Sequence, residues 1–188
     1  MSSIFKGMLA LVFVTTTATS FDPGGLEYRS EKFSLTINSD GSGELTILYK
    51  DFGSKEESRR HRKKDLANLK DSVMANELVV EAGRDGVEIA ERRLDFDNFA
   101  LGAFVRAKSQ AYGRFFDVFT QYRLEIEDMI YITPMNGVVG QATLSEGGKV
   151  VIRNNRYAFA WPTHTTNIHF SATYKTKGIS FRKELEKR

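Results

Sequence analysis

The chain has no cysteine among its 188 residues. It can therefore form no disulfide bond, and it can carry no acylated cysteine of the lipoprotein type. It also has little excess of either charge, because the formal net charge is +3 at pH 7. A balance so close to neutral argues against a protein whose whole surface serves to bind nucleic acid. Any electrostatic role then belongs to a local patch.

Patterns typical of catalytic and metal sites are missing as well. The three histidines are His61, His164 and His169, and a metal site would need carboxylates from distant parts of the chain that no spacing identifies. The chain has no nucleophile elbow, no Walker loop, no zinc-protease helix motif and no dinucleotide fingerprint. We therefore predict no metal and no cofactor. The enzymatic alternative is a hydrolase whose site is assembled from scattered residues such as His164, His169 and acidic side chains.

Residues 1–20 have the pattern of a secretory signal peptide. Lys6 supplies a positive charge, residues 8–14 are apolar, and Ala18 and Ser20 place small side chains before a cleavage site at Phe21. A membrane anchor is the alternative, but only about fifteen residues separate Lys6 from Asp22, against the roughly 20 apolar residues of a spanning helix. We predict a protein exported to the periplasm or the cell exterior, with no transmembrane segment once the leader is cleaved. Residues 21–188 then form one domain of ordinary size.

The start of this domain has the pattern of a β-hairpin. Apolar and polar residues alternate over residues 32–37 and again over residues 44–49, which is typical of strands with one buried face. Residues 38–43, Asn-Ser-Asp-Gly-Ser-Gly, lie between them and are turn formers that tolerate positive φ. The sequence predicts two antiparallel strands joined by this turn.

A long helix is predicted from Lys55 to about residue 76. Ser54 and Glu57 have the spacing of a capping box, and the segment contains no proline or glycine. Its apolar residues come late, with Leu66 and Leu69 at helical spacing, whereas residues 55–65 have no apolar side chain. We expect the second half of the helix to pack on a sheet and the first half to face solvent or a partner.

The first half of this helix carries the densest run of charge in the chain. One interpretation is a solvated helix in which Glu56 and Glu57 pair with the bases three and four residues later, each pair contributing a few tenths of a kcal/mol. The other is a binding site for an anionic partner, namely a phospholipid surface, an acidic envelope polymer or an acidic protein face. Nucleic acid is not the expected partner of an exported chain. The candidate binding residues are Arg59, Arg60, Arg62, Lys63 and Lys64.

The middle of the chain predicts strands followed by a short helix. Residues 78–80 and 87–90 suggest a second hairpin, with a bulge near Arg92 and Arg93, and residues 100–108 suggest a further strand. A short helix is predicted over residues 110–121, with one face rich in aromatic side chains. Such a face usually packs in the core. The alternative is a pocket for a lipid-like or other apolar ligand, lined by Phe115 and Phe119 together with Tyr112.

From residue 122 onward, alternation predicts strands almost throughout. Tyr157, Phe159 and Trp161 share one face of a strand that Pro162 ends, and a last strand covers residues 168–174. Residues 179–188 are charged and are predicted to form a short appendage. Because the helices and strands are segregated along the chain, the predicted class is α+β, a mainly antiparallel sheet with one long helix and one short aromatic-rich helix.

The order of these features resembles a group of small exported bacterial proteins. The features are the leader, the strand and turn of residues 35–43, the Leu-Thr-Ile-Leu-Tyr strand of residues 45–49, a charged helix, and Trp161-Pro162 near the end. Together they resemble exported proteins of uncharacterised function, many of them lipoproteins and some of the LppM type. This chain departs from those lipoproteins because it has no cysteine to acylate. The resemblance implies an exported α+β domain and no catalytic residues.

The sequence therefore predicts a non-enzymatic binding or interaction module for an envelope component or an apolar ligand. A third class, a structural subunit of an envelope assembly, would expose an apolar patch on a sheet face or a sheet edge.

Overall fold

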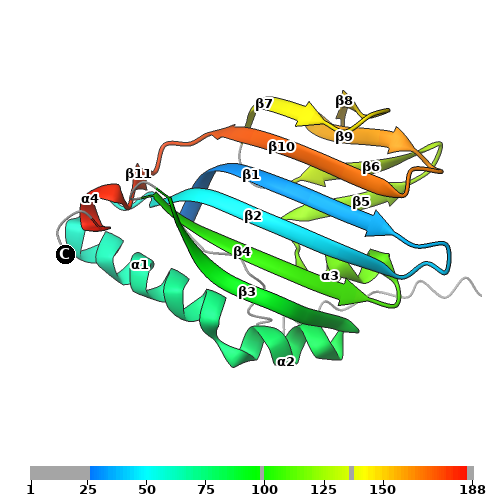
Figure 1. Cartoon of the computed structure of the whole chain (residues 1–188). Helices are drawn as coiled ribbons and strands as arrows, with labels where there is room; N and C mark the ends of the chain where they lie inside the picture. Colours follow the sequence, from blue (N-terminus) through cyan, green and yellow to red (C-terminus); the bar gives the residue numbers. More distant parts are fainter. Residues whose placement is uncertain (1–25, 98–99, 136–137, 186–188) are drawn as a thin grey trace, which may run out of the picture.

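The computed structural model describes residues 26–97, 100–135 and 138–185 of the chain, with the side chain of Lys183 excepted. The predicted leader lies outside these residues. Two antiparallel sheets and a few short helices make up the described part (Figure 1), which confirms the predicted α+β class. Among the described residues, no helix has both the length and the apolar character needed to cross a membrane.

The larger sheet has the strand order β3-β4-β2-β1-β10-β7, and β11 adds to β2. Its strands are β1 (Leu26–Ile37), β2 (Gly43–Ser54), β3 (Val87–Asp97), β4 (Ala100–Ser109), β7 (Val138–Leu144), β10 (Asn167–Lys175) and β11 (Ile179–Ser180). The predicted first hairpin is confirmed: β1 pairs antiparallel with β2, and Gly41 in the turn has φ of +84°. The predicted bulge is present in β3, where the register shifts between Ile89 and Glu91, slightly earlier than expected.

The smaller sheet has the order β5-β6-β9-β8 and packs on one face of the larger sheet. Its strands are β5 (Tyr122–Ile126), β6 (Met129–Pro134), β8 (Lys149–Arg153) and β9 (Arg156–Pro162). Trp161 and Phe159 of β9 are fully buried, and both rings meet Phe170 of β10. The predicted shared face of β9 is therefore the face that joins the two sheets.

The helices are α1 (Arg59–Met74), α2 (Asn76–Arg84), the 3₁₀ turn η1 (Tyr112–Arg114), α3 (Phe115–Val118) and α4 (Arg182–Leu185). In Figure 1, α1 and α2 run along the β3 and β4 side of the larger sheet. Leu66, Leu69 and Val73 of α1 are buried in the same core as the smaller sheet. The helices and the smaller sheet thus share one face of the larger sheet, and these elements leave its other face uncovered.

Two helix predictions need correction. The long helix begins at Arg59 rather than at residue 55, because Ser54 is the last residue of β2 and its hydroxyl bonds to Asp65 and to the backbone N–H of Glu56 instead of capping a helix. The aromatic helix is shorter than residues 110–121 and consists of η1 followed by α3. Phe119 leaves helical geometry after Val118, and the chain enters β5 at Tyr122.

The predicted strand over residues 78–80 is wrong, because these residues belong to α2. Leu78 and Ala82 are buried one helical turn apart, whereas Val79 and Val80 are exposed. The spacing of four residues between the buried side chains is that of one face of an α-helix. The short apolar run that suggested a strand therefore has one residue on the buried face and two on the exposed face.

The predicted C-terminal appendage is also wrong. Ile179 and Ser180 pair with β2, and Phe181 is fully buried in the core. Glu184 of α4 is buried and forms an ion pair of 3.0 Å with Arg62 of α1. The buried ring, the strand pairing and the ion pair together hold this segment on the domain.

Gly148 lies where a side chain has no room. An added Cβ would stand 2.6 Å from Nε1 of the buried Trp161 and 2.8 Å from the Cβ of Leu144. We expect Gly148→Ala to lower the free energy of unfolding by about 2 kcal/mol, the usual cost of overpacking a core. Urea unfolding measures this change. The matched control is Gly83→Ala in α2, where nothing lies within 4 Å of the added atom, and equal stability of the two variants would contradict a tight contact between Gly148 and Trp161.

Candidate functional site

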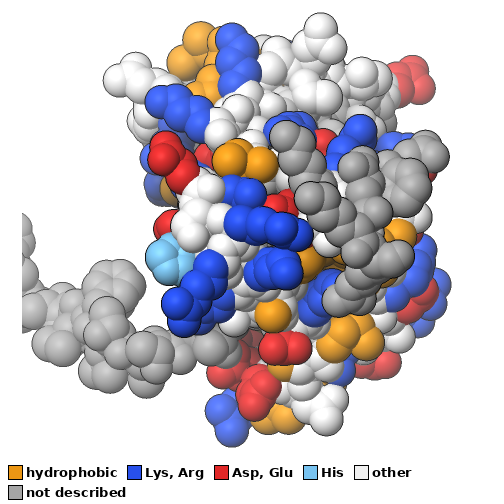
Figure 2. Space-filling model, turned by 90° about the vertical axis from the view of Figure 1, so that its left-hand side faces the viewer, with side chains coloured by type: hydrophobic (Ala, Val, Ile, Leu, Met, Phe, Trp, Pro, Cys, Tyr) orange, Lys and Arg blue, Asp and Glu red, His pale blue; other side chains and the backbone are white. Residues whose placement is uncertain are grey.

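The first two turns of α1 present positive charge at one end of the molecule. We call Arg59, Arg60, Lys63 and Lys64 the basic stripe, and all four residues are exposed. Figure 2, which faces the end where α1 begins, shows Lys and Arg side chains gathered there. With about 100° between successive residues, the four side chains cover an arc of about 140° on the helix. The buried Leu66 and Leu69 lie outside that arc.

Arg62 is the one residue of the predicted binding set that points elsewhere. Its side chain is 11% exposed, and its Nε donates to Oε1 of Glu184 over 3.0 Å. Its Nη1 also donates to the carbonyl oxygens of Glu56 and Glu57. Arg62 therefore holds the loop before α1 and the segment after β11 together, and it supports the basic stripe rather than extending it.

The basic stripe forms no ion pair with any described residue. The expected pairs with Glu56 and Glu57 do not form at Arg59 or Arg60, because both glutamates precede the helix and so lack helical spacing. The pair that does form joins His61 to Glu56 over 3.4 Å. The first turn of α1 contains no acidic residue, although the positive end of the helix dipole favours acidic residues there. The stripe is thus electrostatically unfavourable for α1 itself.

Phe115 and Phe119, the predicted apolar-ligand residues, lie in the hydrophobic core. Phe115 is fully buried and Phe119 is 2% exposed. Neither residue lines the surface pockets around Asp51, Gly86 and Arg153. Core packing explains the aromatic face of this segment without a ligand, and a ligand role for the two rings stays a prediction.

The three histidines are exposed and lie in different elements. His61 is in α1, His164 is in the turn after β9, and His169 is on the exposed side of β10. Among the described residues, no group of three or more histidines and carboxylates could hold a metal ion.

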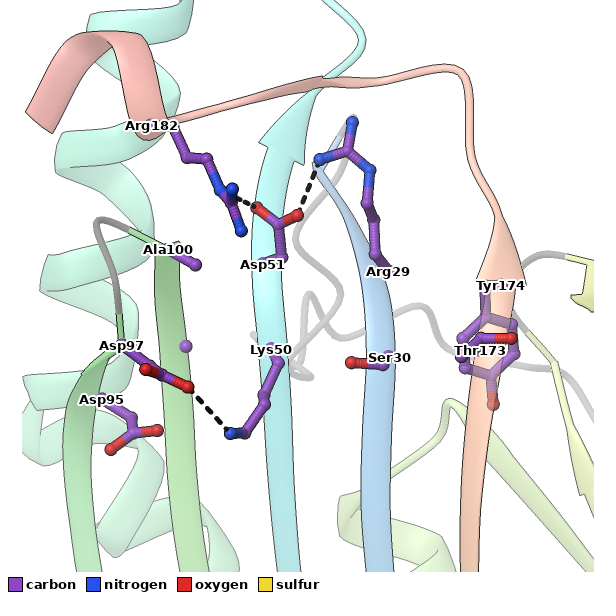
Figure 3. A pocket seen from close by; sticks show the side chains of 11 residues that line it. Arg29, Ser30, Lys50, Asp51, Asp95, Asp97, Ala100, Thr173, Tyr174 and Arg182 are labelled. Atoms are coloured by element: carbon purple, nitrogen blue, oxygen red, sulfur yellow. Dashed lines mark hydrogen bonds and ion pairs between the residues drawn. The ribbon is translucent and has the colours of Figure 1, made fainter. Parts of the chain in front are cut away.

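A polar pocket of about 450 Å³ lies at one end of the open sheet face (Figure 3). Its centre is Asp51, which accepts hydrogen bonds from Arg29 over 2.8 Å and from the Ser180 hydroxyl over 2.5 Å. Burial raises the pKa of Asp51, but these two hydrogen bonds outweigh it and leave the pKa below its usual value. Asp51 also has a φ of 56°, which is uncommon for a residue other than glycine.

Most charged residues of this pocket form ion pairs with one another, and Asp95 alone among them has no ion-pair partner in the described part of the chain. Arg182 lies 3.9 Å from Asp51, and Lys50 pairs with Asp97 over 3.4 Å. The lining residues come from β1, β2, β3, β4, β10 and α4, so no local motif links them in the sequence. The arrangement fixes the C-terminal segment on the sheet, and the described residues that line it include no activated nucleophile.

Glu31 is a buried charge that no motif in the sequence marks. It is 1% exposed and lies on the core face of β1. Tyr122 of β5 donates a hydrogen bond to one carboxylate oxygen over 2.5 Å, and Tyr174 of β10 donates to the other. Glu31 therefore links the two sheets. A signal was present, because the alternation of β1 places residue 31 on the same face as Phe33 and Leu35.

The surroundings of Glu31 raise its pKa to about 7. Burial is the main cause, and the hydrogen bonds from Tyr122 and Tyr174 lower the pKa only in part. Among the described residues, no lysine or arginine forms an ion pair with this carboxylate. The group can therefore hold a proton near neutral pH, while burial and the charge of Glu31 raise the pKa of the Tyr122 and Tyr174 hydroxyls.

Three features of the described residues thus stand out: the basic stripe, the polar pocket and the buried Glu31. Of these three features, only the basic stripe combines exposed side chains with charges that have no ion-pair partner in the described part of the chain. The resemblance to exported proteins of the LppM type stays a prediction. Comparisons with models of protein families, with curated proteins and with solved structures find no match to this chain.

Proposed function

We propose that this protein is an exported, non-enzymatic binding module that attaches to an anionic component of the cell envelope through the basic stripe. The observation that carries the proposal is the placement, at the positive end of α1, of four exposed cations that pair with no described carboxylate. Such an arrangement opposes helix stability, and departures from local rules of this kind concentrate at functional sites.

The fold holds the basic stripe in a defined position. Leu69 and Val73 anchor α1 in the core, and Arg62 ties its first turns to Glu184. The four cations therefore face outward from a helix that is already in place before binding. A preorganised site loses less side-chain and backbone entropy when the partner binds.

The envelope as the place of action rests on the predicted leader, and the anionic chemistry rests on the stripe. A phospholipid surface with negative headgroups is the form of the partner that we test first, because each basic residue near such a surface contributes about 1 kcal/mol. The surface positions of His164 and His169 favour binding over a hydrolase with these residues at its centre.

Co-sedimentation with lipid vesicles tests the proposal directly. The mature chain is mixed at low salt with vesicles of phosphatidylglycerol and phosphatidylcholine, and with vesicles of phosphatidylcholine alone. We expect binding to the first and none to the second, with a loss of binding as salt is raised, because salt screens exposed charges. Absence of binding to the anionic vesicles at low salt would rule out a lipid partner.

A soluble polyanion separates the remaining outcomes. Binding to an acidic polymer such as a teichoic acid, without binding to vesicles, would keep the basic stripe as the site and change the partner. Failure to bind either would overturn the proposal.

A further inference from the structure

An apolar edge of the smaller sheet is left open at β8. This strand is the last in the order β5-β6-β9-β8, so no described strand pairs with its outer side. Ile152 is 70% exposed and Val150 is 45% exposed, and Tyr157, the partner of Ile152 on β9, is 44% exposed. Open edges with apolar side chains invite pairing with another strand.

The backbone hydrogen-bonding groups of Val150 and Ile152 face the open edge of β8. Asn154 and Asn155 both have positive φ, and they join Arg153 to Arg156 in a two-residue hairpin of the type I′ kind. In such a hairpin the residues that flank the turn exchange hydrogen bonds, and the direction of the backbone groups then alternates along the strand. The N–H and C=O groups of Val150 and Ile152 therefore point to the open side.

We propose that β8 pairs with β8 of a second copy of this chain, antiparallel and about a two-fold axis that passes beside Val151. In this register Val150 lies opposite Ile152 of the partner subunit, and the reverse pair repeats it. Both pairs use the backbone groups that point outward, so the two small sheets join into one. Antiparallel pairing about a two-fold axis brings identical surfaces together, which is the usual geometry of homodimers.

The charges of β8 suit the same register. Lys149 and Arg153 have the parity of Val151, so they lie on the face opposite to that of Val150 and Ile152. Pairing places Lys149 of one copy opposite Arg153 of the other. Arg153 is already held by Glu125 over 3.4 Å and by Glu127 over 2.9 Å, and Glu127 remains 58% exposed. The carboxylates beside Arg153 can thus pair with the incoming ammonium group of Lys149. This pairing offsets the repulsion between Lys149 and Arg153.

A second copy fits this edge better than an unrelated strand. The tripeptide Val150-Val151-Ile152 is self-complementary when it is reversed, and the flanking Lys149 finds carboxylates at the other end of the same strand. Moving the two-fold axis by one residue toward Gly148 would set Ile152 opposite Gly148, and moving it toward the turn would set Val150 opposite Asn154, so either shift loses an apolar pair. One register is therefore favoured.

Single cysteines test that register, because the chain has no cysteine of its own. In the proposed pairing, two Val151 residues lie directly opposite, about 4.5 to 5.5 Å apart between Cα atoms, which is within disulfide range. Two Lys149 residues lie about 14 Å apart along the strands, which is too far. We expect mild oxidation of the full mature chain to link Val151→Cys into dimers and to leave Lys149→Cys monomeric. Lys149 is the more exposed position, so random collisions would give the opposite result.

The oligomeric state of the cysteine-free protein gives a second measurement. We expect light scattering after size exclusion to give a dimer for the wild type and a monomer for Ile152→Lys, while Ile126→Lys on the opposite edge strand β5 stays dimeric. Ile126 is 49% exposed and so is a matched control. A monomeric wild type at tens of micromolar, or cross-linking at Lys149→Cys but not at Val151→Cys, would overturn the proposal. Neither result bears on vesicle binding, so this dimer and the proposed function fail separately.

Discussion

The free energy of unfolding is expected to fall by about 3 kcal/mol as the pH rises from about 4.5 to about 7, because of Glu31. The pKa of this buried carboxyl is raised from 4.5 to about 7 in the folded protein. Below pH 4.5 both the folded and the unfolded states hold the proton. Between the two values the unfolded state ionises while the folded state stays protonated, so each increase in pH favours unfolding. Above pH 7 both states are ionised and the effect levels off.

The Glu31→Gln variant separates this effect from all others. Glutamine keeps the shape of the protonated acid and can still bond to Tyr122 and Tyr174, but it does not titrate. We expect the stability of the variant to vary little from pH 5 to pH 7.5 and to equal or exceed that of the wild type at pH 7.5. Urea unfolding at several pH values measures this.

The control is Glu88→Gln, which removes an exposed carboxyl of β3 and should keep the pH dependence of the wild type. Asp51 does not interfere, because its pKa is lowered and its own contribution is lost only below about pH 4. A wild type whose stability rises from pH 5 to pH 7 would show that Glu31 is ionised in the folded state across this range, contrary to a raised pKa.

Neutralising the basic stripe is expected to abolish binding to anionic vesicles. The variant replaces Arg59, Arg60, Lys63 and Lys64 by glutamine. At about 1 kcal/mol for each basic residue near an anionic surface, the loss is about 4 kcal/mol, or up to a thousandfold in affinity. Vesicle co-sedimentation at low salt measures the affinity. We expect the variant to be at least as stable as the wild type, because the removed cations oppose the helix dipole.

The matched control removes the same charge elsewhere. The residues replaced by glutamine are Lys32, Arg84, Lys108 and Lys175, which are exposed and form no ion pair with any described residue. We expect this variant to keep most of the wild-type affinity. Equal losses in the two variants would mean that binding follows net charge, and the stripe would then be no site.

Where the sequence predicted structure well, one local pattern dominated. Strict alternation placed β1, β2, β4 and β10, and the Asn-Ser-Asp-Gly-Ser-Gly segment placed the first turn. Where it failed, two patterns competed. Leu78, Val79 and Val80 suit a strand or a buried helix equally, and the buried contacts of Leu78 and Ala82 decided for α2.

The candidate sites divide in the same way. The basic run was visible because its residues are consecutive, and its charge density marked it as a departure from an ordinary domain. The polar pocket and the buried Glu31 were not visible, because their members are contributed by strands far apart in the chain. Glu31 accepts hydrogen bonds from Tyr122 and Tyr174. Asp51 accepts hydrogen bonds from Arg29 and Ser180.

Local patterns were enough to establish the α+β class, the first hairpin and the place of the basic run, because periodicity, turn residues and charge density act over a few neighbouring residues. Packing settled which of the basic residues are exposed, that the C-terminal segment is part of the core, that Glu31 is buried with no described cation paired to it, and that β8 is the edge of the smaller sheet. These properties depend on burial and on contacts between distant segments. The loss of water around a side chain and the groups that it contacts determine these properties, and both are established only when the two sheets pack together.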